Sequence, residues 1–222
     1  MPAVIDHLVI AARTLAEGET WARETFGVAP AGHGAHDAMA TRNALWHLAV
    51  DAPEGHPDAY LEVIAAEDPA PRPRWFGLDD PATRKLLAEG PRLLTWQVRP
   101  PRPLTEALGA LAAAGTDAGR PLPMTRAGFA WSLGIRDDGA LPLAGRCPIA
   151  IDWAAASPHP AQRLAPGGLR LKALSLPDGD DRLDAALAAL DAGRLATRTA
   201  PGSPLSVTLE TPNGAITLAA PA

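Results

Sequence analysis

His7 and Glu62 are the two side chains whose type and surroundings best suit proton or metal chemistry. His7 lies in the apolar run IDHLVIAA, and Glu62 lies in the apolar run AYLEVIA. A carboxylate is costly to bury unless it is paired. Glu62 is therefore expected either to pair with an arginine or to act in a cavity as an acid or base with a raised pKa. His7 is either a metal ligand or general base, or a histidine satisfied by a neighbouring carboxylate.

Further polar candidates lie between these two runs, in the segment HGAHDAMATRNALWHL. His36 either contacts a ligand or belongs to an exposed glycine-containing loop. Thr41 and Asn43 suit hydrogen bonds to a ligand, or equally bonds that hold the loop backbone. His47 alternates with Trp46 on a predicted strand, so one of the two should face a cavity and the other a helix layer.

The elements that must position these residues form a repeated β-α-β-β-β pattern. The first copy comprises a strand at 5–12, a helix from Thr14 to Phe26, and strands at 43–50 and 59–65. Thr14 with Glu17 forms a capping-box pattern, and Gly27 suits a helix end. The second copy comprises strands at 93–99, 120–126, 129–136 and 148–153, with a helix from 103 to 115 after the first of them.

The spacing within the two copies predicts which residues are equivalent. Glu62 follows His7 by 55 positions, and Asp152 follows Trp96 by 56 positions. We therefore expect Trp96 and Asp152 to occupy, in the second copy, the places of His7 and Glu62. Gln97 is expected to point to the opposite face of its strand.

A third, shorter unit is predicted after the second copy. It has strands at 169–176, 195–199, 205–210 and 215–218, with a helix that Asp180 could cap. The predicted fold is α+β, with tandem modules (about 4–67 and 92–155) whose strands are mostly antiparallel. Residues 1–165 are expected to form the paired-module domain, and residues 166–222 a C-terminal extension that packs on it.

Composition excludes several classes of protein. The chain of 222 residues has a net charge of -5 and scattered basic residues, which argues against nucleic acid as a partner. No window has the roughly 20 apolar residues of a membrane span, and the N-terminus has no signal-peptide pattern. The single cysteine, Cys147, excludes an intrachain disulfide and reads as a buried thiol. A cytoplasmic protein is expected.

Several motifs in order resemble the glyoxalase-like branch of the vicinal-oxygen-chelate superfamily. They are IDHLVIAA, a helix ending in FG, HGAHDAMATRNALWHL, AYLEVIA, WFGLD, PIAIDW and SPHPA, and together they span roughly residues 4–165. The chain departs from the branch at Ala40, where a glycine is usual. The resemblance implies that the two paired modules form a curved, cup-shaped sheet of eight strands around a small-molecule site.

The resemblance also implies where a metal would bind, because its ligands come from the first and last strands of each module. His7 and Glu62 match two of these positions, and Trp96 and Asp152 match the others. A divalent Fe, Mn, Ni or Zn ion suits imidazole and carboxylate ligands. Trp96 cannot ligate a metal, so the site either lacks a metal, with Trp96 filling its place, or recruits His36.

Two functions follow from this resemblance. The first is a lyase, isomerase or dioxygenase acting on a small oxygenated molecule, with His7, Glu62 and His36 in catalysis. Its ligand contacts would be Thr41, Asn43, His47, Trp75, Trp96 and Asp152, with Trp75 placed to roof the cavity. The second is a non-catalytic protein that binds or sequesters a small molecule. A homodimer is expected in either case.

Overall fold

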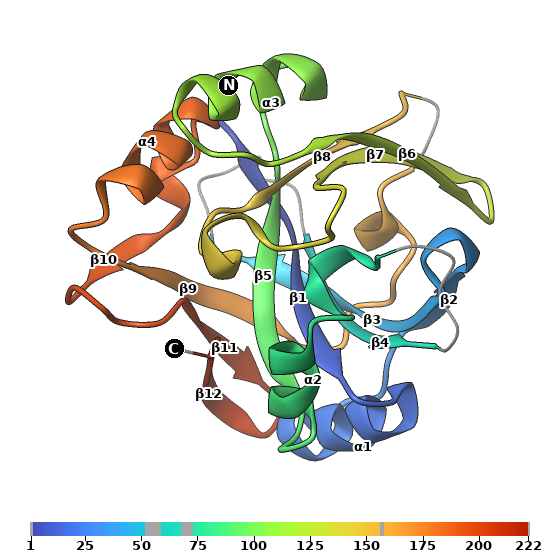
Figure 1. Cartoon of the computed structure of the whole chain (residues 1–222). Helices are drawn as coiled ribbons and strands as arrows, with labels where there is room; N and C mark the ends of the chain where they lie inside the picture. Colours follow the sequence, from blue (N-terminus) through green and yellow to red (C-terminus); the bar gives the residue numbers. More distant parts are fainter. Residues whose placement is uncertain (1, 52–58, 68–72, 156–157, 222) are drawn as a thin grey trace.

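The computed structural model of the chain describes residues 2–51, 59–67, 73–155 and 158–221. In this part of the chain the fold is α+β, with an open, curved sheet of twelve strands and four α-helices (Figure 1). The main path of the sheet runs β12-β11-β9-β3-β4-β1-β5-β8-β7-β6, with β10 beside β9 and β2 beside β3. The predicted fold class is therefore confirmed.

The strands and helices of the two modules lie close to their expected positions. The first module contains β1 (Val4–Ala12), α1 (Leu15–Phe26), β2 (Gly32–His36), β3 (Thr41–Val50) and β4 (Ala59–Ala66). The second contains β5 (Arg92–Arg99), α3 (Leu104–Ala113), β6 (Arg120–Arg126), β7 (Phe129–Ile135) and β8 (Ile149–Trp153), with α2 (Pro81–Leu87) between the modules. The C-terminal unit contains β9 (Arg170–Pro177), α4 (Asp181–Ala189), β10 (Thr197–Thr199), β11 (Ser206–Thr211) and β12 (Gly214–Ala219).

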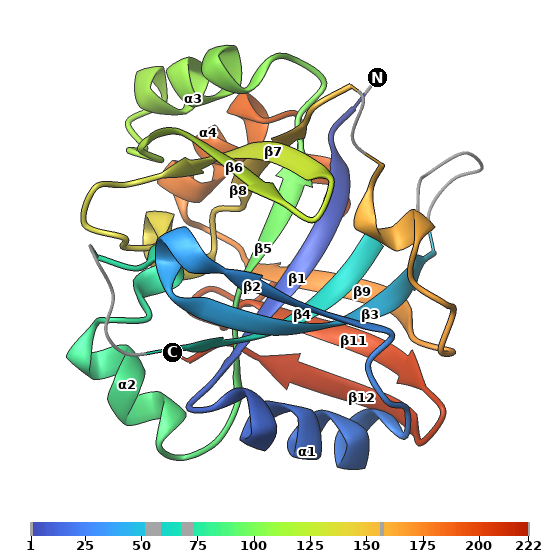
Figure 2. The same cartoon turned by 90° about the vertical axis from the view of Figure 1, so that its right-hand side faces the viewer.

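Strand pairing shows the repeat directly. The first strand of each module pairs in parallel with the last strand of that module, β1 with β4 and β5 with β8. The two first strands, β1 and β5, pair antiparallel at the centre of the sheet. In Figure 2 the β2–β3 pair and the β6–β7 hairpin lie on opposite sides of the cup that these central strands line.

The helix ends follow the expected capping chemistry. The Thr14 side chain accepts a hydrogen bond from the backbone N–H of Glu17, and Gly27 ends α1 with a φ of 73°. The Asp180 side chain accepts from the backbone N–H of Leu183 at the start of α4. These contacts satisfy donors that the first turn of a helix leaves without partners.

Two elements depart from the sequence prediction. β2 covers GHGAH, which reads as a loop because of its glycines and polar residues, but it pairs along its length with β3. α2, which the sequence analysis did not predict, starts at Pro81 and is capped by Asp80. Asp followed by Pro is a signal for a helix start, but here it lies within a proline-containing stretch. Both elements are short, so periodicity could not reveal them.

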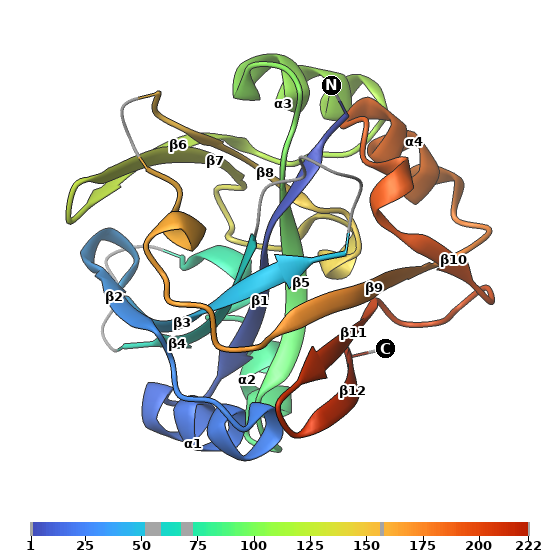
Figure 3. The same ribbon diagram turned by 180° about the vertical axis from the view of Figure 1, so that it is seen from behind.

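The sheet has one face toward the helices and one toward the inside of the cup. Leu8 and Ile10 of β1 belong to the large core under the helices, whereas Val9 and Ala11 belong to a second core inside the cup. The C-terminal unit extends the sheet through β9, which pairs with β3 at Ala49–Arg170 and Val50–Leu171 (Figure 3). No helix in the described ranges is long and apolar enough to cross a membrane.

Candidate active site

A β-bulge in β1 places two consecutive side chains, Asp6 and His7, on the cavity side of the sheet. The pairing with β5 shifts register between Ile5 and His7, so Asp6 is an extra residue in the ladder. As a result both Ile5 and Leu8 reach the core under the helices, although an unbroken strand would direct them to opposite faces.

Asp6 is fully buried and accepts hydrogen bonds from three side chains. Its Oδ1 lies 2.6 Å from His7 Nδ1, and its Oδ2 lies 3.0 Å from His159 Nε2 and 2.9 Å from Trp153 Nε1. Arg99 Nε is 3.1 Å from the same carboxylate. Burial acts to raise the pKa of Asp6, but the bonds from His159 and His7 outweigh it and hold the pKa well below its usual range.

An ionised Asp6 determines which nitrogen of His7 carries the proton. Because Nδ1 faces the carboxylate, it holds a hydrogen, and Nε2 is directed into the cavity. Nε2 lies 3.7 Å from Glu62 Oε2 and 3.5 Å from the hydroxyl of Tyr60. The Tyr60 ring stacks on the imidazole with centroids 4.2 Å apart. The imidazole is therefore held on one side by a carboxylate and open to the cavity on the other.

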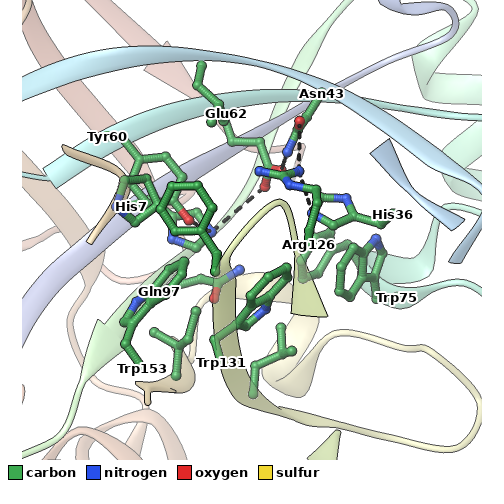
Figure 4. Close-up of a pocket in the computed structure, with 16 residues that line it drawn as sticks. His7, His36, Asn43, Tyr60, Glu62, Trp75, Gln97, Arg126, Trp131 and Trp153 are labelled. Atoms are coloured by element: carbon green, nitrogen blue, oxygen red, sulfur yellow. Dashed lines mark hydrogen bonds and ion pairs between the residues drawn. The ribbon is translucent and has the colours of Figure 1, made fainter. Parts of the chain in front are cut away.

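Tyr60 and Glu62 both come from β4 and face the cup because they are two residues apart. Burial, followed by the charges of Asp6 and Glu62, raises the pKa of Tyr60 well above its usual value, so its hydroxyl stays protonated. The Asn43 amide donates to Glu62 Oε1 across the β3–β4 pair. Figure 4 shows His7, Tyr60 and Glu62 converging on one end of the cavity.

A second group of side chains closes the other end of the cavity. Arg126, from β6, directs Nη1 to His36 Nε2 at 3.0 Å and to Asn43 Oδ1 at 3.3 Å (Figure 4). Because a guanidinium only donates, His36 Nε2 must accept, and its Nδ1–H then donates to Thr41 Oγ1 at 3.3 Å. Burial, and then the positive charge of Arg126, lowers the pKa of His36 to about 3. His36 is therefore a neutral hydrogen-bond partner.

The cavity between these groups is small and largely aromatic. Its volume is about 30 Å³, enough for one or two water molecules. It is lined by residues of both modules: His7, His36, Asn43, Leu45, Tyr60, Glu62, Trp75, Phe76, Gln97, Arg126, Phe129, Trp131, Leu133, Ile151, Trp153 and Pro160. The site therefore depends on the pairing of the two modules.

The structure brings most of the predicted site residues of the first module together. His7, Glu62, His36 and Asn43 line the cavity, as does Trp75. Thr41 and His47 do not line it. Thr41 is buried behind His36, while His47 is half-buried opposite Tyr60 on the cavity side of β3.

Both predictions for the second module were wrong. Trp96 lies in the core under the helices, where its Nε1 donates to the backbone oxygen of Arg146 at 3.0 Å, and Gln97 lines the cavity instead. Asp152 is exposed, and its neighbour Trp153 faces the cavity. Equal spacing to the following helix misled here, because the number of residues between a side chain and the next helix does not determine which face of the strand that side chain occupies. The pairing of β5 with β1 determines which side chains of β5 face the cavity. In this pairing Gln97 lies opposite His7.

Among the lining or supporting residues that escaped the sequence prediction, Asp6, Tyr60, Arg126 and Trp131 show why. Asp6 stands next to His7, so only knowledge of the bulge could place both on one face. Tyr60 had a signal, since it precedes Glu62 by two on the same strand. Arg126 and Trp131 come from the β6–β7 hairpin, and nothing local shows that their side chains reach the residues of the first module across the cavity.

The donor set does not fit the four-ligand metal site that the resemblance implies. His7 and Glu62 supply one imidazole and one carboxylate, and Gln97 adds an amide whose Oε1 is buried without a hydrogen-bond partner. Asp152, the residue expected at the fourth ligand position, is exposed and does not line the cavity. Among the described residues, no three His, Cys, Asp or Glu side chains gather where they could hold a metal ion. We therefore derive no chemical step through a metal.

The comparison with protein families agrees with the fold. Residues 5–191 match a glyoxalase-like domain, so the chain belongs to that family, within the vicinal-oxygen-chelate superfamily. The matched region includes α4 of the C-terminal unit. A sequence search of curated proteins gave no match.

Solved structures with a similar fold include both enzymes and a protein described as hypothetical. A hypothetical protein from Staphylococcus aureus has a TM-score of 0.55 at 11% identity, covering 99% of this chain and 86% of its own. A mutant 4-hydroxymandelate synthase from Streptomyces coelicolor has a TM-score of 0.50 at 18% identity, covering 99% and 63%. A methylmalonyl-CoA epimerase variant from the same organism has a TM-score of 0.45 at 19% identity, covering 71% and 99%. At these identities the likeness concerns the fold.

Proposed function

We propose that the protein is an isomerase- or lyase-type enzyme that removes a proton from a carbon beside a carbonyl group in a small oxygenated molecule. The observation that carries this proposal is the buried Asp6–His7 pair. A carboxylate on Nδ1 holds the imidazole in one tautomer and stabilises the imidazolium that forms when Nε2 takes a proton. The two modules would supply the rest of the substrate's surroundings.

The electron flow of such a step is simple. The substrate C–H bond breaks, its proton forms an N–H bond at His7 Nε2, and the electron pair moves to the carbonyl oxygen. The neutral hydroxyl of Tyr60 and the amide of Gln97 are two donors that line the cavity and would stabilise the developing oxyanion. Glu62, 3.7 Å from Nε2, is placed to receive the proton from His7 and return it elsewhere on the substrate. Return of the proton completes an isomerisation, whereas loss of a leaving group gives a lyase reaction.

Solvent exchange in D₂O tests this proposal without knowledge of the substrate. The wild-type protein is incubated with a panel of small carbonyl compounds, and loss of the α-hydrogen signal is followed by proton NMR. His7→Gln should slow exchange by at least about 100-fold, the usual contribution of a general base. His33→Gln is the matched control, because His33 is exposed and bonded to Glu19 away from the cavity. A panel without exchange, or equal rates in wild type and His7→Gln, would refute the proposal.

The same preparations test the metal that the resemblance implies. Elemental analysis for Fe, Mn, Ni and Zn is made on wild type and Glu62→Gln. We expect substoichiometric metal in both. One equivalent of metal in the wild type that is lost in Glu62→Gln would show that Glu62 is a metal ligand and would contradict a metal-free proton transfer at this end of the cavity.

Binding without chemistry is the second candidate function, and the aromatic lining favours it. Trp75, Trp131 and Trp153 present three indoles to one cavity, and aromatic side chains are common in sites for small organic molecules. Thermal stabilisation by panel compounds without any exchange would support this alternative. A cytoplasmic location and a homodimer stay predictions from the sequence.

A further inference from the structure

Arg126 is the one lysine or arginine among the described residues that line the cavity. It projects from the end of β6 and lies half-buried beside the ring of Trp131, with Cζ 6.0 Å from the ring centroid. The guanidinium stays charged at all accessible pH values. The cavity therefore contains one permanent positive charge.

The contacts of this cation are with neutral groups. Its Nη1 donates to the imidazole of His36 and to the amide oxygen of Asn43. Asn43 also separates it from Glu62, because the amide nitrogen of Asn43 is bonded to that carboxylate. A guanidinium that is partly removed from water and bonded to neutral acceptors gains most from an added anion. This is the electrostatic setting of an anion-binding residue.

The backbone beneath Arg126 leaves room for the guanidinium. A Cβ atom added at Gly34 would lie 2.0 Å from Arg126 Nη1 and 2.3 Å from Cζ. Any side chain at position 34 would therefore push the guanidinium away from His36 and Asn43. β2 thus provides a recess in which the positive charge lies against the cavity.

Arg126 also lies between the cavity and the outside. A groove of about 350 Å³ runs along β6 and the segment after β2, and it shares His36 and Arg126 with the cavity. The inner cavity is too small for an organic acid without some movement. Among the described strands, β6 is the last of the sheet and pairs only with β7, so its end can shift without breaking other strand pairs.

We propose that Arg126 binds the carboxylate of a small monoanionic organic acid and directs the rest of that molecule toward His7. This inference deepens the proposed function and rests on it for the reaction at the other end of the cavity. A planar guanidinium fork matches a carboxylate, and one cation matches one negative charge. The neighbouring carboxylate of Glu62 disfavours a dianion such as phosphate.

Pairs of ligands that differ only in charge test carboxylate binding by Arg126 directly. Thermal shift and calorimetric titration are made with carboxylates and their uncharged amides, namely pyruvate with pyruvamide, propionate with propionamide, and benzoate with benzamide. The wild type should bind at least one carboxylate about tenfold or more tightly than its amide. Arg126→Gln should remove this preference. Arg120→Gln, on the exposed far end of the same strand and paired with Asp137, should keep it.

A second variant guards against a folding defect in Arg126→Gln. Gly34→Ala keeps the charge and should weaken carboxylate binding by displacing the guanidinium. Equal binding of carboxylates and amides by the wild type would refute carboxylate binding by Arg126. A preference for carboxylates that survives in Arg126→Gln would refute it too. The D₂O exchange of the wild type is scored separately. A preference for carboxylates without D₂O exchange would support carboxylate binding by Arg126 and refute the proposed proton transfer.

Discussion

Replacement of His36 by glutamine should reduce the loss of stability at mildly acidic pH. His36 is buried beside Arg126, and its pKa is lowered from 6.5 to about 3, first by burial and then by that positive charge. The unfolded chain therefore binds a proton on this residue between pH 6.5 and 3, whereas the folded chain does not. Stability conferred by keeping His36 neutral must fall as the pH drops through this window, and at pH 7.5 the residue contributes no pH dependence.

The magnitude follows from the width of the window. Each pH unit below 6.5 costs about 1.4 kcal/mol, so the free energy of unfolding should fall by about 2 kcal/mol between pH 6.5 and pH 5 from His36 alone. Asp6 adds a loss in the same direction, but only near and below its ordinary pKa of 3.8. Measurements above pH 4.5 therefore separate the two residues.

Urea unfolding followed by tryptophan fluorescence measures this effect. Wild type, His36→Gln and His33→Gln are compared at pH 7.5, 6.5, 5.5 and 5.0. We expect His36→Gln to lose about 2 kcal/mol less than wild type between pH 6.5 and pH 5, and His33→Gln to follow the wild type. Identical pH slopes for wild type and His36→Gln would refute the neutral, Arg126-bound state of His36.

Two further predictions concern other buried groups. Asp6→Asn should lower the free energy of unfolding by about 3–5 kcal/mol and abolish D₂O exchange, because it leaves Arg99 without a buried negative charge and replaces one of the two acceptor oxygens beside His7, His159 and Trp153 by an N–H donor. Urea unfolding at pH 7.5 measures the first effect, and a change below about 1 kcal/mol would contradict it. Cys147 is fully buried, and burial raises the pKa of its thiol to about 12, so an aromatic disulfide reagent at pH 8 should label it only after unfolding. Rapid labelling of the native protein would show that the thiol is accessible.

The sequence predicted the fold well because the fold depends on local patterns. Short apolar runs marked the strands, and Thr14 and Asp180 marked helix starts that the structure confirms. His7, Asn43 and Glu62 of the first module line the cavity, as expected. Local patterns explain this success too, because the residues next to them in the sequence indicate which face of each strand they occupy.

The rest of the site depends on features that have no local pattern. The bulge at Asp6 and the choice of Gln97 over Trp96 follow from the register between β1 and β5, which distant residues determine. Arg126 meets His36 only because the two modules pair to enclose the cavity, and these residues are 90 positions apart in the chain. Spacing along the sequence cannot supply such contacts.

The recess at Gly34 has a consequence for how the sequences of relatives can vary. Positions 34 and 126 are coupled, because a side chain at 34 would occupy the space in which the Arg126 guanidinium lies and would move it away from His36 and Asn43. Relatives with arginine at 126 should therefore have glycine at 34, and relatives that acquire a side chain at 34 should have lost the arginine. In such relatives the preferred molecule would be uncharged, so a single glycine would divide the family by the charge of what it binds.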